Sequence, residues 1–88
     1  MFYAYVLYSE KFDRIYIGQT NNISIRLEKH NSGKVNSTKA YLPWKIIYYE
    51  YFQTRSEVMK REKELKSHKG RDFIRKKLLN GRVRRLPQ

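Results

Sequence analysis

Hydrophobic and polar side chains alternate along the first twenty residues as they do in two short β-strands. Residues 2–9 alternate aromatic and aliphatic side chains, which predicts a strand, and residues 15–19 form a second apolar run. The polar stretch between them includes Asp13 and predicts a turn. Because this turn is short, we expect the two strands to pair as an antiparallel hairpin.

A helix, a loop and a third strand are predicted next. Asn22 is a suitable N-cap, Ile23 and Leu27 repeat at helical spacing, and Gly33 ends the pattern. Residues 34–43 predict a loop of about ten residues, which is longer than most connections and is therefore a candidate for function. Residues 44–52 are dense in β-branched and aromatic side chains and predict the third strand.

Two helices complete the predicted domain. Thr54 and Glu57 form a capping-box pattern that opens a helix running to about His68, and Gly70 is expected to break it. A shorter helix is predicted over residues 71–79. The order strand, strand, helix, strand, helix, helix predicts a small α+β domain with a three-stranded antiparallel sheet flanked by helices.

Charge narrows the choice of partner. The chain carries 20 lysines and arginines against 8 acids, which gives a net charge of +12. This exceeds the magnitude of about 2–8 that solubility alone explains in a small domain, and it favours a polyanion. We expect nucleic acid as the partner, with an acidic membrane surface and plain solubility as the less favoured alternatives. Residues 1–79 form the predicted domain, and residues 80–88 predict a basic, flexible tail.

The sequence contains neither cysteine nor a long apolar run. Without cysteine there is no disulfide framework and no thiolate metal site. No run approaches the roughly 18 apolar residues that a membrane span needs, and the N-terminus lacks the basic start of a secretory signal. We therefore expect a soluble, cytoplasmic protein that does not enter a membrane.

Glu62 is an acid on the apolar stripe of a predicted helix. Val58, Glu62 and Leu65 are spaced i, i+4 and i+7, so the carboxylate should face the sheet. A carboxylate at the margin of a core is costly unless it is paired or holds a metal ion. The residues alone leave open both a metal site and a salt bridge to Arg26 or a lysine.

Four further residues could carry chemistry. Arg26 and His30 lie four residues apart and should border the apolar stripe of their helix on one side. Arginine offers a planar fork for a phosphate, and histidine can transfer a proton near neutral pH. Tyr5 and Tyr16 should lie near one another on one face of the hairpin, but a tyrosine that acts as a base needs a positive charge or a metal to lower its pKa. A solvated helix face and packing tyrosines are the alternatives.

Other catalytic patterns are absent from the sequence. It has no paired carboxylates, no Cys/His metal cage, no phosphate-binding glycine loop and no serine elbow. With one candidate acid, a hydrolase here would use a single metal ion held mostly by water and phosphate. That coordination suits Mg²⁺.

Together these residues resemble the GIY-YIG endonuclease superfamily over residues 3–78. Tyr3-Ala4-Tyr5 stands where the first signature triplet belongs and keeps only its tyrosine, while Tyr16-Ile17-Gly18 copies the second triplet. The first triplet therefore lacks both its glycine and its isoleucine. The other positions that match compact single-domain bacterial members are Arg26, His30, Glu62 and Pro43-Trp44.

The resemblance implies a metal-dependent endonuclease that hydrolyses phosphodiester bonds in DNA. Low sequence specificity or selectivity for DNA structure is expected, because no second DNA-binding domain is attached. Glu62 would bind one Mg²⁺ or Mn²⁺ ion, and Arg26 would stabilise charge on the phosphate. Tyr5 or Tyr16 would activate the water; Tyr5 is the favoured base, with Tyr16 and His30 in its hydrogen-bond network. Flanking phosphates would be contacted by Lys34, Lys39, Lys45 and the C-terminal arginines and lysines.

Two alternatives accompany this interpretation. The first is a catalytically weak or inactive nucleic-acid-binding module of the same fold. The second is a basic interaction protein that docks on a larger repair or restriction complex, which is compatible with either the enzyme or the binding module.

Overall fold

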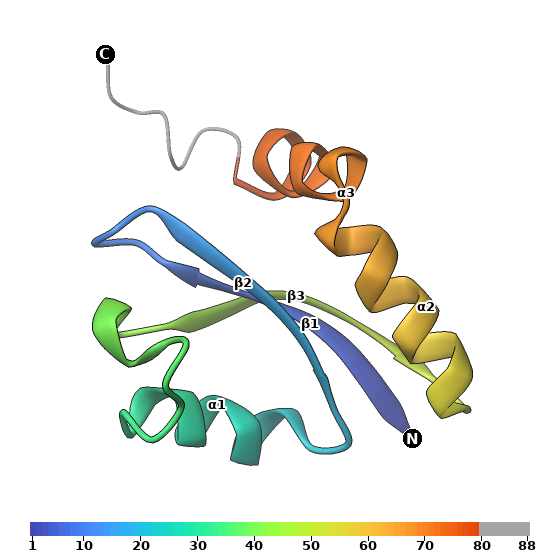
Figure 1. Ribbon diagram of the computed structural model, residues 1–88, viewed down its shortest axis with the longest axis horizontal. Coiled ribbons are helices and arrows are strands. Elements are labelled where there is room, and N and C mark those ends of the chain that lie inside the picture. The colour runs from blue at the N-terminus through green and yellow to red at the C-terminus, as the bar shows by residue number, and fades with distance from the viewer. Residues whose placement is uncertain (80–88) are drawn as a thin grey trace.

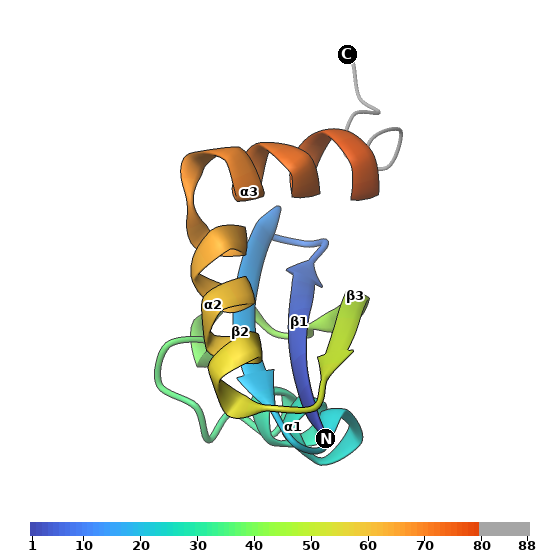
Figure 2. The ribbon, with the colours of Figure 1, turned by 90° about the vertical axis from the view of Figure 1, so that its right-hand side faces the viewer.

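Three strands form one sheet that carries helices on both faces (Figures 1 and 2). The computed structural model describes residues 1–79. The strand order is β2-β1-β3 and both neighbouring pairs are antiparallel, which confirms the predicted α+β fold. The elements are β1 (Phe2–Ser9), β2 (Arg14–Thr20), α1 (Ile23–Asn31), a 3₁₀ turn (Lys39–Tyr41), β3 (Lys45–Phe52), α2 (Arg55–Lys66), α3 (His68–Phe73) and a π-helical turn (Ile74–Leu78).

The central strand β1 is buried on both of its faces. Successive side chains of a strand point to opposite faces, and this alternation divides the core into two clusters. The cluster under α2 and the residues after it contains Ala4, Val6, Tyr8, Ile17, Val58, Leu65, Ile74 and Leu79. The cluster under α1 contains Tyr5, Leu7 and Trp44, with Tyr16, Leu27, Tyr41, Leu42 and Ile46 packed against it.

The predicted ends of α1 are confirmed. The side chain of Asn22 accepts a hydrogen bond from the Ile25 amide at 3.0 Å, which satisfies one of the free donors at the start of the helix. Gly33 follows the helix with a φ of +81°, the left-handed conformation that glycine adopts readily. The predicted loop after it contains one short helical turn, Lys39–Tyr41.

The junction between α2 and α3 differs from the prediction. The capping box at the start of α2 is present, but the chain bends at Ser67, and Gly70 lies inside α3. The Ser67 hydroxyl accepts from the Gly70 amide at 3.2 Å and donates to the Glu64 carbonyl at 2.6 Å. A Cβ at position 70 would lie 2.2 Å from that carbonyl oxygen, so the glycine permits the two helices to meet rather than breaking one of them.

Arg61 fastens α2 to the edge strand β3. Its Nε and one terminal nitrogen each donate to the Glu50 carboxylate at 2.9 Å, and the Tyr48 hydroxyl donates to the same carboxylate. Burial alone would raise the pKa of Glu50, but the hydrogen bonds from Arg61 and Tyr48 hold that pKa below its ordinary value. The carboxylate therefore stays ionised at the helix–sheet boundary.

Two further expectations concern the predicted tail and membrane-spanning segments. The predicted tail, residues 80–88, with its arginines lies outside the described residues. None of the helices within residues 1–79 has the length and apolar character that crossing a bilayer requires.

Candidate active site

Tyr5 and Tyr16 lie side by side on the face of the sheet that α1 covers. Their ring centroids are 6.4 Å apart, as expected from the hairpin. In the register of β1 and β2, Tyr5 lies opposite Gly18 and Tyr16 lies opposite Leu7, so both rings share one face. The predicted proximity is confirmed.

Gly18 leaves room for the ring of Tyr5. A Cβ at position 18 would lie 2.7 Å from the Tyr5 oxygen and 2.8 Å from the carbon that bears it. Tyr5 is only 2% exposed, so its ring has little freedom to move aside. The second signature triplet therefore ends in glycine because the Tyr5 hydroxyl lies directly above it.

Arg26 and His30 both reach the Tyr5 hydroxyl from α1. Nε of Arg26 donates to this oxygen at 3.4 Å, and Nε2 of His30 lies 3.0 Å from it. The His30 ring also packs edge-on against Tyr16, with 4.9 Å between the ring centroids. His30 is completely buried, so the alternative of a solvated helix face is wrong for this residue. Burial is tolerated because both ring nitrogens have partners inside the protein.

Thr38 fixes the proton on His30. Its hydroxyl donates to the Val35 carbonyl at 3.4 Å, so its oxygen accepts from Nδ1–H of His30 at 2.9 Å. The neutral imidazole then presents Nε2 as an acceptor, and the Tyr5 hydroxyl donates to it. The hydrogen bonds run in one direction, from Arg26 through Tyr5 and His30 to Thr38.

Burial sets the protonation of this network. Burial, and after it the charge of Arg26, lowers the pKa of His30 from 6.5 to about 4, so the ring is neutral at neutral pH. Burial also raises the pKa of Tyr5, which outweighs the opposing hydrogen bond from Arg26. In the resting site His30 is therefore a neutral imidazole and Tyr5 is a protonated phenol.

Glu62 lies beside the edge strand β2 and is only 18% exposed. Its Oε1 accepts from the Gln19 amide at 2.7 Å, and its Oε2 lies 3.0 Å from the ammonium of Lys66. The salt bridge that the sequence left open is therefore made to Lys66, one helical turn away. The negative charge of Glu62 is also the smallest of the causes that raise the pKa of Tyr5, so the carboxylate lies within electrostatic range of the phenol.

Glu62 is the candidate metal ligand. Within residues 1–79, no three His, Cys, Asp or Glu side chains gather closely enough to hold a metal ion by themselves. A cation here would take one or both Glu62 oxygens, and water and phosphate would complete its coordination. Carboxylate oxygen is a ligand that Mg²⁺ prefers, so the donor fits, although Lys66 already occupies Oε2.

The three lysines predicted to contact phosphate are scattered. Lys34 and Lys39 are exposed on either side of Thr38, in the segment that follows α1. Lys45 begins β3, the edge strand on the opposite side of β1 from β2, and its ammonium lies 3.5 Å from Glu10. The structure does not bring Lys45 next to the Tyr5 hydroxyl.

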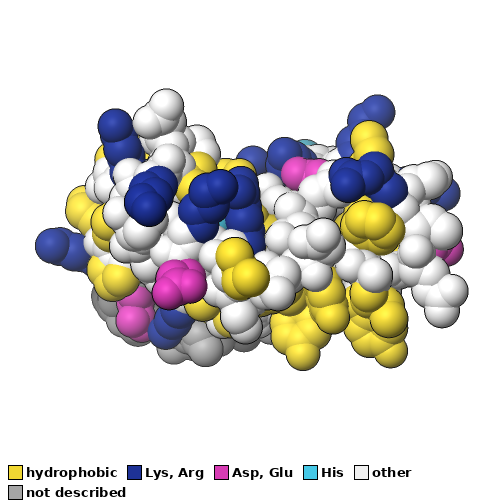
Figure 3. Space-filling model, turned by 90° about the horizontal axis from the view of Figure 1, so that it is seen from below, with side chains coloured by type: hydrophobic (Ala, Val, Ile, Leu, Met, Phe, Trp, Pro, Cys, Tyr) yellow, Lys and Arg dark blue, Asp and Glu magenta, His cyan; other side chains and the backbone are white. Residues whose placement is uncertain are grey.

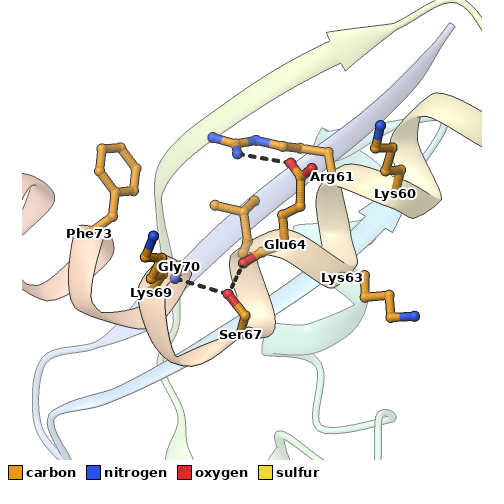
Figure 4. Close-up of a pocket in the computed structure, with 9 residues that line it drawn as sticks. Lys60, Arg61, Lys63, Glu64, Ser67, Lys69, Gly70 and Phe73 are labelled. Carbon is orange, nitrogen blue, oxygen red and sulfur yellow. Dashed lines mark hydrogen bonds and ion pairs between the residues drawn. The ribbon is translucent and has the colours of Figure 1, made fainter.

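A hollow of about 640 Å³ lies elsewhere, where α2 meets α3 (Figure 4). Its rim carries the exposed lysines 60, 63 and 69, and Phe73 lines its wall. Arg61 donates to Glu64 at 3.3 Å, and Ser67 links the two helices, as the dashed lines show. The described residues around this hollow include none of the predicted catalytic side chains, and these contacts stabilise the helix junction.

Two residues of the site were not predicted from the sequence. Thr38 lies in the loop that was a candidate for function because of its length, but nothing in the loop marked this hydroxyl. Gln19 directly follows the second signature triplet and reaches Glu62 from β2. Its place in the polar stretch after that triplet was the only signal available.

Comparisons with known proteins identify the family of the chain. Residues 1–77 match the GIY-YIG catalytic domain. The chain is 38% identical over 66 residues to the UPF0213 protein SH2523 of Staphylococcus haemolyticus, covering 74% of this chain and 79% of that protein. It is 38% identical over 55 residues to a UPF0213 protein of Staphylococcus aureus, covering 61% of this chain and 67% of that protein. No solved structure matches the chain. Because the family model covers residues 1–77 of the 88, the chain belongs to the GIY-YIG family.

Proposed function

We propose that this protein is a metal-dependent endonuclease that hydrolyses phosphodiester bonds in DNA, with low sequence specificity or with selectivity for DNA structure. The family match supports a nuclease-type domain that acts on nucleic acid. The net charge of +12 supports an anionic substrate. Work in the cytoplasm, within a larger repair or restriction complex, is compatible with this activity.

The observation that carries the proposal is the directed network from Arg26 to Thr38. Arg26 has five N–H donors, of which Nε serves Tyr5, and its side chain is only partly buried. The remaining donors are suited to a phosphate, which a guanidinium binds through two parallel hydrogen bonds. A phosphate held there lies beside the Tyr5 oxygen, which in turn is bonded to a neutral imidazole.

In the proposed reaction a water molecule attacks phosphorus and the bond to the 3′ oxygen breaks. The water gives a proton to Tyr5 while Tyr5 passes its own proton to Nε2 of His30, and the leaving oxygen takes a proton from solvent. The low pKa of His30 opposes this transfer. A phosphate paired with Arg26 offsets the positive charge that is one of its two causes. Tyr16, packed on the His30 ring, would keep the imidazole in place.

Glu62 is proposed to hold the single Mg²⁺ or Mn²⁺ ion. When bound, the ion would neutralise charge on the phosphate and on the leaving oxygen. Gln19 would keep one carboxylate oxygen in position, and Lys66 would compete with the cation for the other. Lys34 and Lys39 would contact flanking phosphates, and Lys45 would contact the substrate farther away.

A nucleic-acid-binding module with little or no activity is the second candidate. Two observations favour it, namely the raised pKa of Tyr5 and the occupation of both Glu62 oxygens by Gln19 and Lys66. A phenol that stays protonated is a poor base, and an engaged carboxylate binds a cation less readily. The two candidates predict the same affinity for nucleic acid and differ in turnover.

The test is cleavage of end-labelled DNA at low salt with Mg²⁺ or Mn²⁺. The panel contains a single strand, a duplex, a flap and a four-way junction. We expect the wild type to cut at least one of them, Arg26→Ala to lower the rate about 100–1,000-fold, and Glu62→Gln to abolish cutting. Glu64→Gln is the matched control, because this exposed carboxylate lies on the same helix and pairs with Arg61 instead.

Cleavage, measured beside binding, separates the two candidates. If the wild type binds the panel but cuts none of it, the binding module replaces the enzyme. If Glu62→Gln cuts as fast as Glu64→Gln, the assignment of the metal to Glu62 is wrong.

A further inference from the structure

Three tyrosines line the same face of the sheet as the candidate active site. The ring of Tyr3 lies 6.0 Å from that of Tyr49 and 6.3 Å from that of Tyr51, measured between centroids, and both contacts are edge-on. Tyr49 is 55% exposed and Tyr51 is 63% exposed. We call these three residues the tyrosine platform. Figure 3 looks at the molecule from the side of α1 and shows exposed hydrophobic side chains on the same face as many lysines and arginines.

The strand register places the platform beside Tyr5. Tyr49 lies opposite Tyr5 and Tyr51 lies opposite Tyr3 in the pairing of β1 with β3, so all four rings rise from one face. Tyr5 is buried under α1, whereas Tyr49 and Tyr51 are not covered. Exposed aromatic groups that gather in one patch mark binding surfaces more often than scattered ones do.

A hollow of about 390 Å³ adjoins the platform at the first turn of α1. Tyr3 and Tyr49 form one side of it, and Asn21, Asn22 and Ser24 form the other. The Asn22 oxygen caps the helix, but its NH₂ group and the Asn21 amide supply further donors and an acceptor. Flat rings on one side and amides on the other are what an unpaired nucleobase requires, because it stacks by its face and hydrogen-bonds by its edge.

The hollow and the catalytic network meet different sides of helix α1. The side chain of Asn31 hydrogen-bonds the backbone of Trp44, the residue before β3. Ser24, which lines the hollow, precedes Asn31 by two helical turns and therefore lies on the same side of α1. Arg26 and His30 leave the other side toward Tyr5. A strand bound at Arg26 can therefore continue around the first turn of α1 to the platform.

We propose that the tyrosine platform and its hollow bind one unpaired base of the nucleic acid that the active site acts on. This inference rests on the proposed function for the identity of the polymer. The net charge of +12 supports a polyanion rather than an apolar peptide or a second copy of this basic chain as the occupant. Tyr3 also stands where the first signature triplet of the family has glycine, so this part of the platform belongs to this chain rather than to the family pattern.

The test measures binding without cleavage. Fluorescence anisotropy would compare a labelled single-stranded oligonucleotide with the same sequence in a blunt duplex, using Glu62→Gln protein without added metal. We expect Tyr49→Ala to weaken single-strand binding about tenfold and duplex binding less than twofold, since stacking acts only on an unpaired base. Tyr49→Phe, which keeps the ring, should bind as the parent does. Phe12→Ala is the matched control, because it removes an exposed aromatic ring outside the platform.

Three outcomes would overturn the inference. Tyr49→Ala could leave single-strand binding unchanged, it could weaken single strand and duplex equally, or it could dissociate a dimer in size-exclusion chromatography. Melting curves by circular dichroism establish that each variant is folded. Because the assay needs no turnover, a protein that never cuts but shows the tenfold selective loss supports the platform and contradicts only the proposed catalysis.

Discussion

Thr38 holds the imidazole of His30 through a single hydrogen bond, with 2.9 Å between its Oγ1 and Nδ1 of the ring. Both residues are completely buried, so water cannot replace either partner. The bond comes from a loop residue, yet it decides which nitrogen of a helical histidine faces the Tyr5 hydroxyl. Much of the candidate chemistry depends on this one contact.

Thr38→Val should therefore impair the site while keeping its shape. The buried Nδ1–H loses its acceptor, so we expect the free energy of unfolding to fall by about 1–3 kcal/mol, together with reduced cleavage. Thr38→Ser keeps the hydroxyl and should retain both. Urea denaturation gives the stability, and ¹⁵N NMR of the imidazole gives the tautomer. Equal behaviour of the valine and serine variants would contradict this role.

Gly18→Ala should displace the ring of Tyr5. The new methyl group would lie 2.7 Å from a buried oxygen, so the ring must move away from His30. We expect a destabilisation of about 1–3 kcal/mol and a loss of cleavage. Tyr5→Phe separates the two effects, because it removes the hydroxyl and keeps the ring. It should lose activity with a smaller loss of stability. An alanine variant that melts and cuts like the wild type would show that the clash does not occur.

The free energy of unfolding should fall as the pH is lowered, beginning at a higher pH than the one at which the carboxylates titrate. The pKa of His30 is lowered in the folded state to about 4, against 6.5 for an ordinary histidine, so the unfolded chain binds the proton more tightly. The contribution of the neutral His30 ring to the free energy of unfolding is fully present above pH 6.5. About 3 kcal/mol of it is lost as the pH falls toward 4. Urea titrations between pH 5 and 7 measure the slope.

Two histidine variants test the origin of that slope. His30→Gln should flatten it, whereas His68→Gln should not, because His68 is exposed. Below about pH 4.5, protonation of Glu50, whose pKa is lowered in the folded state, also reduces the free energy of unfolding. The slope is therefore assigned to His30 only from measurements above that pH. A slope that persists in His30→Gln assigns the effect to another group.

Arg61 should matter more to stability than a surface ion pair does. Its side chain is 30% exposed and that of Glu50 is 25% exposed, and two hydrogen bonds join them. Arg61→Met should lower the free energy of unfolding by about 1–2 kcal/mol, because Glu50 keeps its charge without its main partner. Lys76→Met is the control, since it pairs with Asp72 in solvent and should change stability by less than about 0.5 kcal/mol. Thermal denaturation compares the two, and equal losses would contradict the difference.

The sequence predicted what depends on local periodicity. Alternation gave the hairpin, the cap at Asn22 gave the start of α1, and the capping box gave the start of α2, because each signal acts within a few residues. The proximity of Tyr5 to Tyr16 followed from strand pairing. Placing Glu62 on a core-facing stripe was also sound, since the carboxylate is largely buried.

Contacts between distant segments were not predictable in this way. Thr38 reaches His30 only because the loop after α1 returns to that helix, and Gln19 reaches Glu62 across 43 positions of sequence. Gly70 was misplaced because a glycine breaks a helix in most contexts, whereas here it admits the carbonyls of a neighbouring helix. The low pKa of His30 likewise depends on complete burial, which no short-range pattern specifies.

The position of β1 in the middle of the sheet imposes an order on folding. Residues 2–9 are synthesised before β2 and β3, and β2 can pair with one edge of β1 as soon as the hairpin is made. The other edge waits for β3, and the face under α2 stays uncovered until a helix that starts at Arg55 has formed. During synthesis the incomplete chain therefore exposes one edge of an apolar strand, and in that state it can pair with a neighbouring copy of the chain.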